Sequence, residues 1–151
     1  RMNIIGKLSE RVREFYEGLA DGQYIAEIIL DNEAYIVDMN AQEQLFEKGE
    51  NALGISIAEY RPYSPMTLRI KAGKGQPTDR VTLRDEGDFE SSFFVEVGND
   101  RFEIKASDFK AEELSQKYGD IMGLNNENKA ELIWQYLYPA ILEKLKQSLT
   151  K

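Results

Sequence analysis

The sequence contains neither cysteine nor histidine. The missing cysteines exclude disulfide bonds, thiolate metal ligands and cysteine nucleophiles. The missing histidines remove the commonest general base at neutral pH and the commonest ligand of transition metals. A conventional Ser–His–Asp triad cannot be built from this chain. These absences favour a protein that is not an enzyme and carries no cofactor or metal.

Positive charge and long apolar runs are also scarce. The 151 residues include 19 Lys and Arg against 27 Asp and Glu, a net charge of −8. The chain therefore has no overall positive field to attract nucleic acid. No run approaches the roughly 18 apolar residues of a membrane span, and no signal-peptide pattern occurs near the N-terminus. We expect no membrane partner. Apolar residues still make up 42% of the chain, which is enough for the core of one domain spanning 1–151.

The clearest pattern of regular structure covers residues 93–106. Phe93, Val95 and Val97 fall on one side of an extended chain, as do Phe102 and Ile104 of the next segment, while Glu96, Glu103 and Lys105 fall between them. The intervening Gly98-Asn99-Asp100 tolerates positive φ, so it suits a tight loop. The pattern predicts a β-hairpin.

Helical patterns fill the N-terminal third. Residues 2–20 place apolar side chains three and four positions apart, which predicts an amphipathic helix that ends at Asp21-Gly22. A second helix is expected to begin near Gln23. Over 34–40, Ile36 and Met39 continue a helical face, whereas Tyr35, Val37 and Met39 alternate as a strand does. We predict a break near residues 31–33 and a short extended piece over 34–40. Asn40 to Glu43 then reads as a capping box that opens a short helix, closed by Gly49.

A last helix is expected from about Glu127 to Leu149, capped by Asn125 or Asn126. Pro139 lies inside it and predicts a kink near Tyr136. Trp134 belongs to the apolar stripe of this helix, so core packing is the first interpretation. A stacking platform for nucleic acid would need interleaved basic residues, and its neighbours are not basic.

Glycine and proline punctuate residues 48–80, so we predict a long central loop there. Its aromatic residues leave two alternatives, a loop that orders on a partner and a loop that folds back on its own core. The chain as a whole is then α+β, with a small antiparallel sheet and with N- and C-terminal helices packed on one face. Further strands are expected in 34–40 or 80–83. The open edges of such a sheet favour contact with a partner.

Two short motifs suggest ligand binding only weakly. Asp85, Glu86, Asp88 and Glu90 could supply oxygen ligands to a metal-dependent nuclease, but they crowd into one turn and read better as a solvated acidic turn. Residues 71–77 are rich in Gly and Lys, yet their spacing differs from that of a phosphate-binding loop.

The turn before the hairpin resembles a known family motif. Leu83, Gly87, Phe89 and Ser92 match the Leu, Gly, apolar and Ser positions of a pattern that leads into a strand in small morphogenesis proteins of tailed bacteriophages. These are the head–tail connector, neck and tail-completion proteins. The spacing of Gly54, Ile57, Tyr60 and Tyr63, and the later Tyr118-Gly119, are also similar to that family.

The resemblance implies a structural virion protein that forms a ring with copies of itself and contacts portal, neck or tail proteins, while DNA passes without specific binding. It would be made in the bacterial cytoplasm. A ring needs two different patches on each subunit. We predict that the hairpin edge and the central loop provide them, the loop through Tyr60, Arg61, Tyr63, Met66, Arg69, Lys71 and Lys74. The alternative is a protein-binding regulatory module encoded by a prophage or a bacterium.

Overall fold

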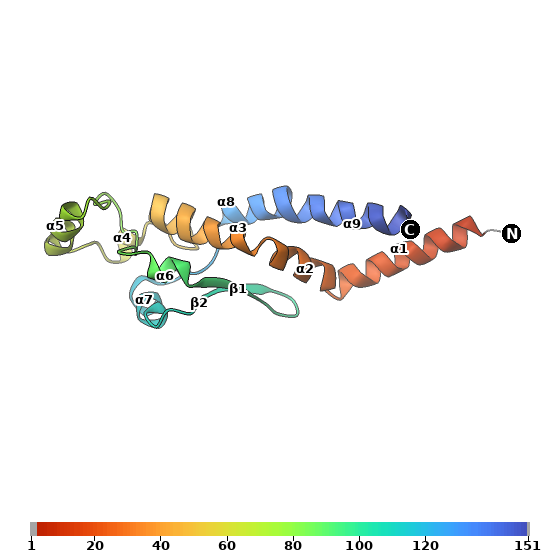
Figure 1. Cartoon of the computed structure of the whole chain (residues 1–151), viewed down its shortest axis with the longest axis horizontal. Helices are drawn as coiled ribbons and strands as arrows, with labels where there is room; N and C mark the ends of the chain where they lie inside the picture. Colours follow the sequence, from red (N-terminus) through yellow and green to blue (C-terminus); the bar gives the residue numbers. More distant parts are fainter. Residues whose placement is uncertain (1–2, 151) are drawn as a thin grey trace.

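The computed structural model describes residues 3–150 and has a mixed α+β fold with helices at both ends of the chain. Figure 1 shows an elongated molecule in which two long helical runs lie side by side. The first run contains α1 (Ile4–Ala20), α2 (Gln23–Asp31), α3 (Glu33–Asp38) and the π-helical segment η1 (Met39–Lys48). The second contains α8 (Asn126–Glu131), the π-helical segment η2 (Leu132–Leu137) and α9 (Tyr138–Thr150).

Between these runs the chain forms short helices and the hairpin. They are α4 (Ile57–Tyr60), α5 (Pro65–Gly73), α6 (Asp88–Ser91), β1 (Phe93–Val97), β2 (Phe102–Ala106) and α7 (Ala111–Tyr118). The predicted hairpin is confirmed, with Phe93 opposite Ala106 and Val95 opposite Ile104 in an antiparallel register. Within residues 3–150 the sheet has only these two strands, so the strands expected at 34–40 and 80–83 were wrong.

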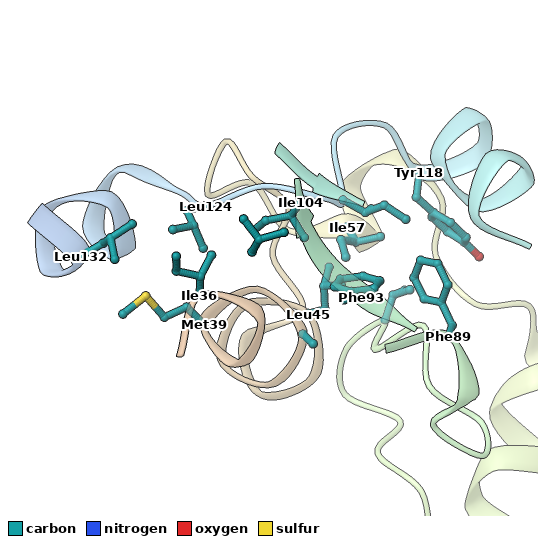
Figure 2. Close-up of a cluster of buried hydrophobic side chains, with 14 of the residues drawn as sticks. Ile36, Met39, Leu45, Ile57, Phe89, Phe93, Ile104, Tyr118, Leu124 and Leu132 are labelled. Carbon is teal, nitrogen blue, oxygen red and sulfur yellow. The ribbon is translucent and has the colours of Figure 1, made fainter. Parts of the chain in front are cut away.

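The core lies where α3 and η1, the hairpin and the segment before α8 meet. Figure 2 shows its side chains converging from these elements. Alternation in the strands directs Phe93, Val95 and Ile104 inward, while Phe94, Glu96 and Glu103 stay exposed. The larger buried members are Ile29, Ile36, Met39, Leu45, Ile57, Phe89, Ile121, Leu124 and Leu132.

The extended piece predicted over 34–40 was wrong, because this stretch is helical. The chain does break at Asn32, between α2 and α3, as expected. After the break, Ile36 and Met39 are fully buried three residues apart, a spacing that only a helix brings onto one face. Burial on that face therefore overrides the alternation that Tyr35, Val37 and Met39 also show.

The capping box predicted at Asn40–Glu43 was wrong for a related reason. Asn40 lies inside the continuous helical run and is completely buried, so its side chain cannot cap a helix start. The predicted stop at Gly49 is confirmed. Gly49 has a φ of 65°, the left-handed conformation that ends helices readily when the residue is glycine.

The segment 48–80 is a loop only in part, because it contains α4 and α5. Ser64 caps α5, its Oγ accepting a hydrogen bond from the N–H of Thr67 at 3.1 Å, and Pro65 occupies the first turn. A Ser-Pro pair is a normal helix start. Figure 1 places α5 at the end of the molecule far from both termini.

The last helix begins where expected. The Oδ1 atom of Asn125 accepts a hydrogen bond from the N–H of Asn128 at 2.9 Å, which confirms Asn125 as the cap. Pro139 donates no backbone hydrogen bond, and the helix passes through the π-helical η2 in the turn before it. Core packing of Trp134 was wrong. Its side chain is 65% exposed, and Leu132 takes the buried position instead.

Candidate interaction surfaces

A network of buried side-chain amides fixes the segment that precedes the last helix. Asn40 donates from Nδ2 to the carbonyl oxygen of Ile121 at 2.9 Å and accepts at Oδ1 from the N–H of Gly123 at 2.8 Å. Gln44 donates to the carbonyl oxygen of Gly123 and accepts from the N–H of Asn125, both at 2.9 Å. Since buried polar groups are costly when unpaired, these bonds select one conformation for the segment.

Sequence reasoning missed this network. A signal for it exists, because Asn40 and Gln44 follow Ile36 at spacings of four. Amides that share a helical face with a core residue must be buried with it, and each then needs a partner. The sequence does not say which backbone groups supply those partners.

An open groove lies beside the fixed segment and has a volume of about 790 Å³. One wall is β2 and the other is the start of the last helix, with residues 122–124 between them. Its apolar lining comes from Phe102, Ile104, Met122, Leu124, Leu132, Ile133 and Leu137, and its charged lining from Glu103, Lys105 and Lys129.

The helix α1 carries an apolar face that no other part of residues 3–150 covers. The inward residues of α1 pack on the molecule, with the Phe15 ring 5.8 Å from that of Tyr24. Arg11 also donates from Nη1 to the carbonyl oxygen of Leu149 at 3.1 Å, which ties α1 to the end of α9. In contrast, Ile5 is 80% exposed. The exposed large apolar residues of α1, named here the α1 face, are Ile4, Ile5, Leu8, Val12 and Tyr16.

The last helix has an exposed aromatic stripe of its own. Trp134 and Tyr138 meet edge to face, with ring centroids 5.7 Å apart, and Leu142 continues the row one turn later. Exposed apolar residues are unremarkable when single, whereas contiguous rows of them mark binding surfaces. No basic residue alternates with these rings, so stacking on nucleic acid is not favoured.

The residues of the family-like motif build the turn into the hairpin. Leu83 has a φ of 58°, and Gly87 has a φ of 92° at the start of α6. Phe89 is buried, with its ring edge to face against that of Phe93 at 5.0 Å. Ser92 donates from Oγ to the carbonyl oxygen of Phe89 at 2.7 Å. The motif is therefore a structural turn whose side chains support β1.

The residues predicted as a subunit interface fall into two groups. Lys71 is buried, donates from Nζ to the carbonyl oxygen of Arg84 at 2.8 Å, and lies 5.0 Å from the ring centre of Tyr63. Tyr63 in turn accepts at its hydroxyl from the N–H of Thr82 at 3.1 Å. These two residues hold their own segment together. The exposed ones are Tyr60, Arg61, Met66, Arg69 and Lys74, of which Lys74 pairs with Asp85 at 2.7 Å.

The acidic turn is occupied by internal pairs. Asp85 bonds to Lys74 at 2.7 Å, and this ammonium group lowers the pKa of the Asp85 carboxyl. Glu90 is buried 3.4 Å from Nε of Arg84, and burial raises the pKa of Glu90 although Arg84 opposes the shift. Within residues 3–150, no group of three or more acidic side chains converges on a point where a metal ion could bind.

Comparisons with known proteins found no relative of this chain. No family model matches the chain, and no curated protein or solved structure is similar to it. Across the described part of the chain, the helices are also too short or too polar to cross a bilayer. The exposed apolar rows and the groove are thus the features of the molecule that bear on its function.

Proposed function

We propose that this chain is a non-enzymatic structural subunit of a tailed-bacteriophage particle, located in the neck or tail-completion region. It assembles with copies of itself and with neighbouring portal, neck or tail proteins. It is made in the bacterial cytoplasm and becomes part of the virion. The motif turn from Leu83 to Ser92 supports the phage assignment, and the uncovered α1 face carries the assembly role.

The α1 face supports assembly on energetic grounds. Burying apolar surface is worth about 25 cal/mol per Å², so five large side chains on one helix form a substantial contact when a partner covers them. Leaving Ile5 and Val12 in water would forgo that free energy. Figure 1 shows that α1 extends past the body of the molecule, where a neighbouring subunit can reach it.

The positions of the α1 face and of the 48–80 segment also suit a ring, with the α1 face as the second patch in place of the hairpin edge predicted from the sequence. A ring closes through contacts between two different patches on each subunit. The α1 face lies at one end of the elongated molecule, and the exposed residues of the 48–80 segment, Tyr60 and Met66 among them, lie toward the other. Head-to-tail contact between such patches would link neighbours. The acidic net charge of −8 would let DNA pass through the ring without adhering.

Electron microscopy of the purified chain with a portal protein tests the proposal. Wild type should give rings or density docked on the portal. Val12→Glu should abolish both because it places a charge in the α1 face, while Lys7→Glu, which adds the same side chain on the polar side of α1, should not. Circular dichroism must show equal helix content in both variants. A wild-type chain that stays monomeric and ignores virion proteins would contradict this role and favour the regulatory alternative.

A further inference from the structure

Two backbone hydrogen bonds fix the alternation of the hairpin ladder. The N–H of Ser107 donates to the carbonyl oxygen of Ser92 at 3.1 Å, and the N–H of Gly98 donates to that of Arg101 at 2.7 Å. In an antiparallel pair, residues that bond across the ladder alternate with residues whose backbone groups point away. Every second residue of β2 therefore directs its N–H and C=O away from β1.

The outward groups of β2 belong to Phe102, Ile104 and Ala106. Within residues 3–150, no hydrogen bond uses the backbone N–H or C=O of these three residues. The outer edge of β1 differs, because the N–H of Val95 donates to Oε2 of Glu33 at 3.0 Å and α2 and α3 pack along this strand. The hairpin thus has one covered edge and one open edge.

The open edge faces the apolar groove. Residues Phe102 to Lys105 form its strand wall, and η2 forms the opposite wall through Leu132, Ile133 and Leu137. Figure 2 shows Ile104, Leu124 and Leu132 coming from the strand, the fixed segment and the last helix. A second sheet edge cannot approach β2 here, because the last helix stands on the far side. One extended chain can, since strands lie about 4.8 Å apart.

We propose that this groove binds an extended segment of a partner protein, which adds to β2 as a third strand. The partner's backbone bonds to Phe102, Ile104 and Ala106, and its apolar side chains at alternate positions enter the groove. A helix would not suffice, since its backbone groups already bond within the helix. The inference deepens the proposed function, because it rests on the chain acting through protein contacts.

The charges at the rim specify one further feature of the partner segment. Glu103 lies close to both Arg101 and Lys105, at 3.7 Å from each. Lys129 is exposed on the opposite wall and forms no ion pair within the described part of the chain. A segment with an acidic side chain beside Lys129 therefore complements the groove.

Selection from a random displayed peptide library on the purified full chain tests this inference. Enriched peptides should alternate apolar and polar residues and contain an acidic residue. Ile133→Lys, which puts a charge into the groove, should weaken their binding by at least about tenfold. Gln135→Lys serves as the matched control, because Gln135 is exposed on the same helix outside the groove, and it should bind as wild type does.

Amide hydrogen exchange of the complex provides the second readout. A bound peptide should slow exchange at Phe102, Ile104 and Ala106 and leave Phe94 and Glu96 unchanged. The inference fails if no sequence is enriched, if Ile133→Lys binds as wild type does, or if exchange at Ile104 does not slow. The experiment needs no phage component, so its failure is distinguishable from failure of the proposed virion role.

Discussion

Asn128 donates from Nδ2 to Oε1 of Gln44 at 2.8 Å, although the two residues are 84 positions apart in the chain. Both side chains are fully buried. The bond joins η1 to α8, and Gln44 also holds Gly123 and Asn125 of the segment between the hairpin and α8. Gln44 therefore sets the position of residues 122–124, which form the floor of the groove, and Asn128 holds the Gln44 side chain in place.

Gln44→Ala should destabilise the protein by about 3 kcal/mol or more. The substitution leaves the N–H of Asn125 and the carbonyl oxygen of Gly123 without a partner, and each buried unpaired group costs about 1–3 kcal/mol. It also removes the shorter of the two hydrogen bonds of Nδ2 of Asn128, which keeps only the carbonyl oxygen of Met39 at 3.4 Å. Urea unfolding measures the change. Gln135→Ala, on the exposed side of η2, is the control and should shift stability by less than about 0.5 kcal/mol. Equal effects of the two substitutions would refute the role of the network.

Glu90→Gln should be at least as stable as wild type at neutral pH. Burial raises the pKa of Glu90, so the folded state disfavours its charged form. The unfavourable contribution develops as the pH rises from the ordinary pKa through the raised one, and it is complete above that value. The advantage of the variant should therefore shrink as the pH falls through the raised pKa.

Urea midpoints of wild type and Glu90→Gln, compared at a series of pH values, check this expectation. Glu86→Gln, an exposed substitution in the same turn, controls for loss of a negative charge. If Glu90→Gln were strongly destabilising at neutral pH, the pair with Arg84 would outweigh the cost of burial and the interpretation would be wrong.

Gly87→Ala should cost about 1 kcal/mol of stability through the backbone alone. Its φ is 92°, which side chains with a Cβ adopt poorly, but a Cβ at this position meets no atom within 4 Å. Gly73→Ala is the matched control. Gly73 is the last residue of α5 and has an ordinary φ, and a Cβ added there also meets no atom within 4 Å. It should stabilise the protein by about 0.5 kcal/mol. The unfolding temperatures of both variants show whether the turn at Gly87 requires glycine or tolerates other residues.

Trp134 should be accessible to acrylamide in the isolated chain. It is the only tryptophan, so the fluorescence of the protein reports on this residue alone. Emission close to that of free tryptophan and strong quenching are expected because its side chain is largely exposed. A blue-shifted and protected emission from monomeric protein would mean that Trp134 packs in the core after all.

The elements that were predicted correctly from the sequence are those whose formation depends on neighbouring residues. The alternation around Phe93 and Ile104 defined the hairpin, and Asn125 and Gly49 marked helix ends, because each pattern depends on a few neighbouring residues. The turn at Gly87 was recognised for the same reason.

What the sequence could not supply depends on distant contacts. The buried face of η1 is decided by backbone groups around residue 123, so Asn40 looked like a cap until its partners were known. The π-helical η2 changes which side of the last helix faces inward. The regular α-helical spacing therefore predicted, wrongly, that Trp134 is buried, whereas Leu132 takes that position. The groove appears only when β2 and this helix are seen together.

The copy number of this chain in intact phage particles tests the central claim most directly. Quantitative mass spectrometry of purified virions should find a fixed number of copies per portal, with Val12→Glu lost from the particles and Lys7→Glu retained. Absence of the wild-type chain from mature particles would contradict its role as a structural subunit.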